Sequence, residues 1–253
     1  MQIYPTDLTD NQWSKIEKLF DNRKRKHSQR AIVHALLYIT KSGIQWRMLP
    51  KEYPKWQLVY CYFRKWTCEG LIEEMHELLR SLCRKQAGKD ITPSLGLIDS
   101  QSVKTSSMTQ EKGYDGGKKI QGRKRHIITD TMGFILAVVV HSAALQDREG
   151  AKLVIQELWF KYPQLKKILA DGGYTGKLAL WVLKLTGWTM EIVSNVTEIS
   201  GFNVIPKRWI VERTFEWFNF NRRLAKDYEM NMDCSTAFIQ LTMCRIRLNR
   251  IKK

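Results

Sequence analysis

Apolar residues in the first third of the chain recur three and four positions apart, which is the period of an amphipathic α-helix. This pattern predicts helices over LTDNQWSKIEKLF, RAIVHALLYITKSG, KWQLVYCYFRKWTCEG and Ile72–Lys85. Thr9 stands at the start of the first helix, where a hydroxyl side chain can cap free backbone N–H groups. Gly43 and Gly70 stand where the second and third helices end, as glycines often do. We interpret residues 1–88 as a small all-α domain.

The third predicted helix mixes aromatic residues with Lys55, Arg64 and Lys65, and it follows a connector that contains Pro50 and Pro54. A helix, a connector and a basic, aromatic helix are typical of a helix-turn-helix-like DNA reader. A plain helical bundle with the aromatic side chains in its core accounts for the same pattern. This segment alone leaves the two interpretations open.

After a linker at QAGKDITPS, short strands alternate with helices. LGLIDS, KKILAD and TMEIVS are predicted strands. RKRHIITD and GFILAVVVHSAAL flank the short turn Thr131-Met132-Gly133, which predicts a β-hairpin. Helices are predicted over Asp147–Tyr162, KLALWVLKL, Lys207–Asp227 and Ser235–Lys252. This order indicates an α/β domain with helices covering its sheet. We assign it residues 89–253.

The charge of the chain points to a polyanionic partner. Lysine and arginine total 42 against 25 acidic residues, which gives a net charge of +17 and a pI near 9.7. Such a surplus attracts nucleic acid. The five cysteines form no C-x-x-C pair or zinc spacing, and the apolar run Phe134–Val140 is far too short to span a bilayer. We therefore expect a cytoplasmic protein with reduced thiols and no membrane partner.

Two predicted strands end in an acid, Asp99 in LGLIDS and Asp171 in KKILAD. Ligands bind beyond the carboxyl ends of strands in open α/β sheets, so both carboxylates could meet at one edge. Mg²⁺ prefers oxygen ligands, and two-metal phosphoryl transfer needs about three converging acids. The segment KRWIVERTFEWFNFNRRL offers Glu212 and Glu216 as the third, one helical turn apart. Spacing does not choose between them.

The segment GYDGGKKIQGRKRH, between Asp99 and the hairpin, concentrates basic residues among glycines. We interpret it as a flexible loop that contacts DNA phosphates, against the alternative of a solvated loop. Ser100 and Ser102 have no evident histidine partner, which argues against a serine nucleophile. His126 and His141 are interpreted as strand residues. The predicted DNA contacts in the basic segment are Lys118, Lys119, Arg123, Lys124 and Arg125.

LIDSQSVKT, the basic segment with its hairpin, ILADGGYTG and WIVERTFEWFNFNRRL together resemble the successive blocks of bacterial DDE-type insertion-sequence transposases, with the insertion-sequence-five family nearest. The helical front resembles the domain that precedes the catalytic domain in that group. The wider superfamily pattern sets Tyr, Arg, Glu and Lys or Arg at fixed spacing. Arg208 and Glu212 match it, whereas Ile205 and Asn219 depart from it, which keeps Glu216 as an alternative.

The resemblance implies an RNase H-like mixed sheet flanked by helices, with Asp99, Asp171 and Glu212 as catalytic residues and ligands of Mg²⁺, for which Mn²⁺ can substitute. It implies cleavage at insertion-sequence inverted-repeat ends, joining of the 3′-OH to target DNA, and a homodimer on double-stranded DNA. A metal-dependent nuclease of the same fold and a non-catalytic DNA-binding repressor are the alternatives. Further predicted DNA contacts are Arg208, Arg222 and Arg223.

Overall fold

The computed structural model describes residues 3–21, 23, 26–193 and 209–251. The chain forms two compact units: Met1–Ile91 with Phe218–Lys253, and Thr92–Trp217. The change between units after Ile91 lies close to the predicted division at residue 88. The division differs at the other end of the chain, because Phe218–Lys253 packs with the helical unit and was assigned to the sheet domain from the sequence.

The first unit is all-helical over its described residues. Thr9 caps α1 as predicted, and its side chain and that of Gln12 form a reciprocal capping box. Gly43 adopts a left-handed conformation at the end of α2. The helices are α1 (Asp10–Ser14), η1 (Glu17–Leu19), α2 (Gln29–Ser42), η2 (Trp46–Met48), α3 (Trp56–Cys68), α4 (Leu71–Gln86), α8 (Arg222–Ala225) and α9 (Met232–Arg250).

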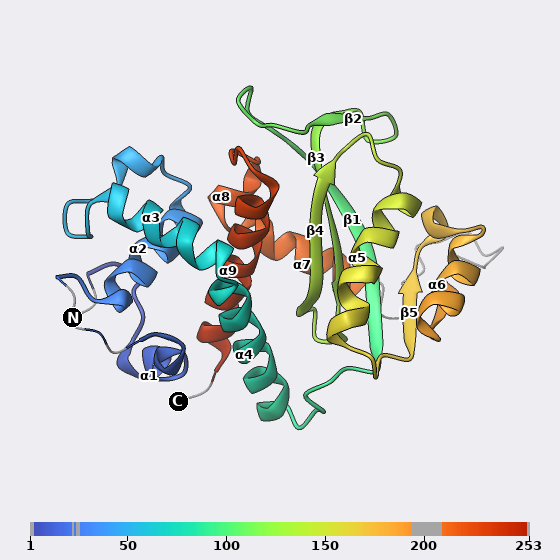
Figure 1. The fold of residues 1–253 in the computed structure, drawn as a ribbon, viewed down its shortest axis with the longest axis horizontal. Coiled ribbons are helices and arrows are strands. Elements are labelled where there is room, and N and C mark those ends of the chain that lie inside the picture. Colours follow the sequence, from blue (N-terminus) through green and yellow to red (C-terminus); the bar gives the residue numbers. More distant parts are fainter. Residues whose placement is uncertain (1–2, 22, 24–25, 194–208, 252–253) are drawn as a thin grey trace. The chain divides into compact units, whose positions relative to one another are not determined.

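Helices from both ends of the chain share the core of this unit. Helix α9 lies beside α4 (Figure 1), and the Arg247 guanidinium donates a 2.8 Å hydrogen bond to the backbone oxygen of His76. The rings of Phe63 in α3 and Phe238 in α9 lie 4.7 Å apart. Both phenylalanines are fully buried. The aromatic side chains of α3 therefore contribute to a core, as the helical-bundle interpretation expects, and DNA reading by this unit stays a prediction.

The second unit is built on a six-stranded mixed sheet with the order β2-β3-β1-β5-β6, in which β4 pairs with β3. β1 is antiparallel to β3 and parallel to β5, and β6 continues the parallel part. This arrangement confirms the predicted RNase H-like mixed sheet. The strands are β1 (Leu95–Lys104), β2 (Gly113–Asp115), β3 (Ile120–Thr129), β4 (Ile135–Ser142), β5 (Lys167–Ala170) and β6 (Thr189–Ile192).

Helices flank this sheet as predicted. Helix α5 (Asp147–Lys161) lies against β3 and β4 (Figure 1), and its residues Ala151, Val154, Ile155 and Leu158 join Ile98 in the core. Helix α6 (Leu178–Thr186) packs beside β6. The predicted hairpin is confirmed: β3 and β4 pair around a turn in which Gly133 has a φ of 80°.

Two predicted helices are interrupted. The first, over LTDNQWSKIEKLF, is divided into α1 and the 3₁₀ turn η1. The second, predicted over Lys207–Asp227, is divided into α7 (Trp209–Asn219) and α8, and its first two residues lie outside the described residues. Asn221 stands at the break in an extended conformation and is fully buried, and its side chain accepts hydrogen bonds from Arg245. A buried polar contact therefore overrides the continuous helical pattern.

We predict that Gly122→Ala destabilises the sheet strongly. A Cβ on Gly122 would lie 1.9 Å from the backbone oxygen of Val103, so the paired strands would have to separate. We expect the free energy of unfolding, measured in urea by circular dichroism, to fall by about 3 kcal/mol or more. A Cβ on Gly116 meets no atom within 4 Å, so Gly116→Ala should stay within about 0.5 kcal/mol of the original protein. Equal effects at the two glycines would contradict this account.

We also predict a pH dependence from His76, which is buried in α4. Burial and the neighbouring Arg247 guanidinium lower the pKa of His76 to about 4, whereas the pKa in the unfolded chain is about 6.5. Below pH 6.5 the unfolded chain binds a proton that the folded chain does not. The contribution of neutral His76 to the free energy of unfolding is therefore fully present above about pH 6.5. It is lost as the pH falls toward 4, by up to about 1.4 kcal/mol per pH unit.

His76→Gln should therefore flatten the plot of unfolding free energy against pH between about 6.5 and 4. An unaltered slope in His76→Gln would rule out this source of the pH dependence.

Candidate active site beside two parallel strands

The register between β1 and β5 brings two acids together. Leu97 pairs with Leu169 in the parallel ladder, and Asp99 and Asp171 each lie two residues further along. Neighbouring strands run about 4.8 Å apart, and side chains two residues apart point to the same face. Asp99 and Asp171 therefore lie on the same face of the sheet, the one to which the two leucines point. β1 does not end at Asp99, as predicted, but continues to Lys104, so Asp99 lies within the strand. The pairing of Leu97 with Leu169 is the observation that supports the prediction that these two carboxylates lie close together.

Backbone amides orient both carboxylates. Asp99 accepts a 2.7 Å hydrogen bond from the backbone N–H of Ser100. Asp171 caps the 3₁₀ turn η3 (Gly172–Tyr174) and accepts a 2.8 Å bond from the N–H of Gly173. A Cβ on Gly172 would meet no atom within 4 Å. The backbone beside Asp171 is thus open enough for a bulky anion to approach closely.

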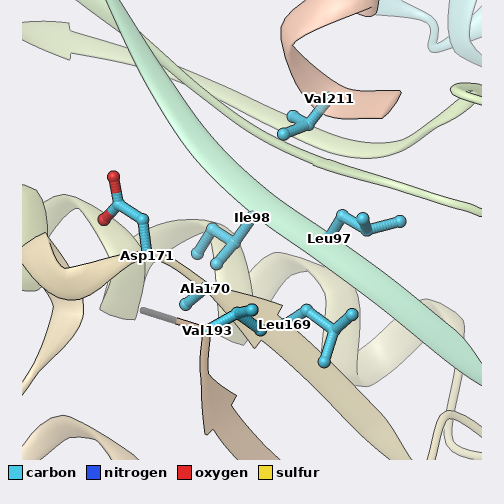
Figure 2. A pocket seen from close by; sticks show the side chains of 7 residues that line it. All are labelled: Leu97, Ile98, Leu169, Ala170, Asp171, Val193 and Val211. Atoms are coloured by element: carbon cyan, nitrogen blue, oxygen red, sulfur yellow. The ribbon is translucent and has the colours of Figure 1, made fainter. Parts of the chain in front are cut away.

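Helix α7 brings Val211, the residue before Glu212, to the strands that carry the two aspartates. Val211, the preceding residue, lines a small apolar pocket together with Leu97, Leu169 and Asp171, and Figure 2 shows Val211 pointing from α7 toward the strands. The neighbouring Thr214 donates a 2.8 Å hydrogen bond to the backbone oxygen of Gly133 and fixes α7 on the hairpin. Glu212 and Glu216 are both exposed on α7, but only Glu212 directly adjoins a residue of this pocket.

Two carboxylates at one edge suit a hard divalent cation, because Mg²⁺ usually takes one or two protein carboxylates and completes its shell with substrate phosphate and water. Asp99 and Asp171 supply that donor set. Within the described part of the chain, no three His, Cys, Asp or Glu side chains are close enough together to hold a metal ion among themselves. A role for Glu212 as third ligand is therefore a proposal.

The opposite face of β1 carries a polar network under the start of α5. Lys124 donates from its Nζ to Asp147 at 2.9 Å and lies 3.5 Å from Asp115. Ser100 donates to Asp147, and Ser102 donates to Asp115. Burial raises the pKa of Asp147, but hydrogen bonds from Lys124 and Ser100 outweigh it and lower the pKa overall. Asp147 begins α5 as expected from the sequence, and it also belongs to this network, which was not expected.

The prediction of a flexible basic loop is wrong for Ile120–Thr129, because these residues form strand β3. Arg123, Lys124 and Arg125 are buried there and contact protein groups: Arg123 donates to the Gln110 oxygen and Arg125 to the Gln101 side chain. A sequence does not distinguish a long cationic side chain that is buried with a hydrogen-bond acceptor from one that is exposed at the surface.

Of the other predicted DNA contacts, Lys118 and Lys119 lie on the exposed turn between β2 and β3. Lys118 donates a 2.9 Å bond to the Ser100 oxygen, one residue from Asp99. Arg222 is exposed on α8, whereas Arg223 is buried and pairs with Glu229. Arg208 lies outside the described residues. Exposed cations thus remain at Lys118, Lys119 and Arg222.

Sequence reasoning missed Tyr174, which is buried at the end of η3. Its hydroxyl lies 2.8 Å from Nε2 of His126, and Nδ1 of His126 lies 3.2 Å from Nε2 of His141. Burial, and then the charges of Asp99, Asp147 and Asp171, raise the pKa of Tyr174. The two histidines, interpreted as strand residues, therefore link the hydroxyl beside the acids to the interior.

Comparison with known proteins assigns the chain to a family. Residues 90–246 match the model described as transposase DDE domain, and residues 8–76 match the putative transposase of the IS4/5 family. A putative transposase for insertion sequence element IS402 of Burkholderia cepacia is 29% identical over 139 residues, which are 52% of this chain and 65% of that protein. The insertion element IS402 uncharacterized 16.2 kDa protein of the same organism is 30% identical over 117 residues, 42% of this chain and 78% of its own.

The chain thus spans somewhat less than two thirds of the IS402 transposase that it matches. Among the described helices, each is too short or too polar to cross a bilayer. The family model covers more than half of the chain and includes Asp99, Asp171 and Glu212. The chain therefore belongs to the DDE transposases, with an amino-terminal segment of the IS4/5 family.

Proposed function

We propose that this protein cuts DNA at the inverted-repeat ends of an insertion sequence and joins the freed 3′-OH to target DNA. The observation that carries the proposal is the parallel pairing of Leu97 with Leu169, two residues before Asp99 and Asp171. Val211 of α7, the residue before Glu212, lines the pocket that Asp171 also lines. A pair of acids at a sheet edge, in a chain of net charge +17, suits a phosphodiester substrate.

In this proposal Asp99, Asp171 and Glu212 hold divalent ions, Mg²⁺ or Mn²⁺. Bound there, the ions would supply Lewis-acid activation of a water or a 3′-OH and would stabilise the leaving oxygen. The protein contributes the fixed orientation of both aspartates through the N–H groups of Ser100 and Gly173. The open backbone at Gly172 leaves room for the phosphate.

Exposed lysines near Asp99 would attract the phosphates of a DNA strand toward the acidic residues. Lys118 is tied to the Ser100 oxygen, so its ammonium lies beside the Asp99 segment, and Lys119 follows on the same exposed turn. Such contacts position a DNA backbone without reading its sequence. We assign sequence reading to the helical front segment and propose that two copies act together on paired DNA ends within the bacterial cytoplasm.

A strand-transfer assay with a terminal-repeat oligonucleotide and Mg²⁺ tests the proposal. Asp99→Asn and Asp171→Asn should each reduce cleavage and joining by at least about 10³-fold, because each removes a carboxylate charge that holds the divalent ions, and the ions stabilise the transition state. Glu212→Gln should do the same, while Glu216→Gln, one turn away on α7, is the matched control and should stay near the original activity.

The products separate the alternatives. Joined strands support the transposase, whereas nicked DNA without joined strands indicates a nuclease. Tight DNA binding without cutting indicates a repressor. Loss of activity in Glu216→Gln but not in Glu212→Gln would exchange the roles of the two glutamates, and full activity of Asp99→Asn would refute the proposed site.

We predict opposite effects for two adjacent arginines of α8. Arg223 is 7% exposed, lies 2.5 Å from Glu229 and stacks 4.9 Å from the centre of the Phe238 ring. Arg223→Ala should cost about 3–5 kcal/mol of unfolding free energy, because Glu229 would be left buried without its cation. Arg222→Ala should leave stability nearly unchanged and weaken DNA binding. The slope of log affinity for DNA against log salt concentration, measured by fluorescence anisotropy for Arg222→Ala, should fall by about one, which corresponds to one lost phosphate contact.

The result that counts against this assignment is a change in the salt dependence of DNA binding for Arg223→Ala with no loss of stability. Such a result would mean that the partner of Arg223 is DNA and not Glu229.

A further inference from the structure

A buried chain of hydrogen bonds runs from the acidic edge into the sheet unit. It begins at the Tyr174 hydroxyl, passes through His126 on β3 and His141 on β4, and ends at the backbone oxygen of Ser142, which lies 2.9 Å from Nδ1 of His141. Tyr174 and His126 are no more than 2% exposed, and His141 is 6% exposed. The order of the protons along this chain can be worked out from its last acceptor.

A backbone carbonyl can only accept, so Nδ1 of His141 carries a proton and donates it to Ser142. Burial lowers the pKa of both histidines, that of His126 to about 3, so both imidazoles are neutral. Nε2 of neutral His141 must then accept, and Nδ1 of His126 donates to it. Nε2 of His126 must accept in turn, and the Tyr174 hydroxyl donates to it.

This order makes the chain a fixed support. Because its His141 end lies on a carbonyl that cannot take up a proton, no proton can be relayed out through that end. It also turns the proton of Tyr174 away from the acidic edge, where the charges of Asp99 and Asp171 act on the phenol. Tyr174 ends the three-residue turn that starts directly after Asp171. Whatever fixes the hydroxyl of Tyr174 also fixes that turn.

We propose that Tyr174 is a positioning residue: the His126–His141 pair holds its hydroxyl, and Tyr174 thereby holds the η3 turn and the Asp171 carboxylate in place beside Asp99. This inference deepens the proposed function and rests on it. Tyr174 itself takes no part in bond breaking. Its contribution is to keep one ligand from drifting, since small misplacements of reacting groups reduce rates steeply.

The rest of the unit is adapted to this pair of histidines. A Cβ on Gly150 of α5 would lie 2.5 Å from Nε2 of His141 and 2.6 Å from Nδ1 of His126. Glycine inside a helix is less favourable than alanine, and a buried polar side chain is unfavourable unless it is hydrogen-bonded. The sheet unit therefore carries a helix glycine and two buried imidazoles at one place. The glycine and the two imidazoles are both explained if the histidine pair serves to hold the Tyr174 hydroxyl.

Tyr174→Phe tests the proposal, because it removes the hydroxyl and keeps the ring. Hydrogen exchange of residues 172–174, followed by mass spectrometry, should be faster by about tenfold in this variant. The kcat for DNA cleavage should fall by about 10- to 100-fold, with KM for DNA within about twofold. Tyr162→Phe is the matched control: it alters another buried tyrosine of the same core, and it should leave both readouts unchanged.

Two substitutions at His126 test whether the hydroxyl acts through it. Glutamine offers one acceptor and one donor group, so His126→Gln can accept from Tyr174 and donate to His141 in the same order. Its exchange and kcat should stay within about threefold of the original protein. His126→Leu removes both groups and should resemble Tyr174→Phe in both readouts.

Unchanged exchange at residues 172–174 in Tyr174→Phe would overturn the inference. Equal losses of kcat in Tyr174→Phe and Tyr162→Phe would overturn it as well, because they would reflect general destabilisation. If the original protein neither cuts nor joins DNA, the proposed function fails, while the exchange comparison still decides whether Tyr174 holds the turn after Asp171.

Discussion

The parallel pairing of β1 with β5 is the constraint on which the acidic edge depends. Leu97 and Leu169 are partners in that ladder, and the acids two residues further along each strand are carried to the same place. Because side chains alternate in a strand, a slip of one residue would send one carboxylate to the opposite face. Val211 of α7 lines a small apolar pocket together with Leu97 and Leu169, so this part of α7 lies next to both strands.

The two faces of β1 separate two kinds of polar chemistry. On one face, acids lie at an edge that a phosphate can approach. On the other, Lys124 lies between Asp115 and Asp147 beneath α5, so opposite charges are buried together. A buried cation held by two acids is unavailable to DNA, even though its sequence neighbours suggest a basic loop. Position in the sheet, rather than local charge density, decides which cations face solvent.

Much of the sheet unit could be predicted from the sequence, because the apolar runs before Asp99 and Asp171 identify both strands, although β1 continues past Asp99 to Lys104. Neither the break before α8 nor the burial of β3 cations could be, since both depend on acceptors distant in sequence, such as Asn221 for Arg245 and Gln110 for Arg123. The hydrogen bonds of Tyr174 with His126 and of His126 with His141 could not be predicted for the same reason: these partners meet only once the strands pair.

The division of the chain into units has a consequence for its synthesis. The sheet unit is one continuous stretch, Thr92–Trp217, whereas the helical unit needs Phe218–Lys253 as well as the first ninety or so residues. Domains fold as they leave the ribosome, earlier segments first. Here the helices of the first ninety or so residues lack α9, which completes their core, until Met232–Arg250 has been synthesised. The sheet unit has all of its residues sooner, so a nascent chain completes the sheet unit before the helical unit.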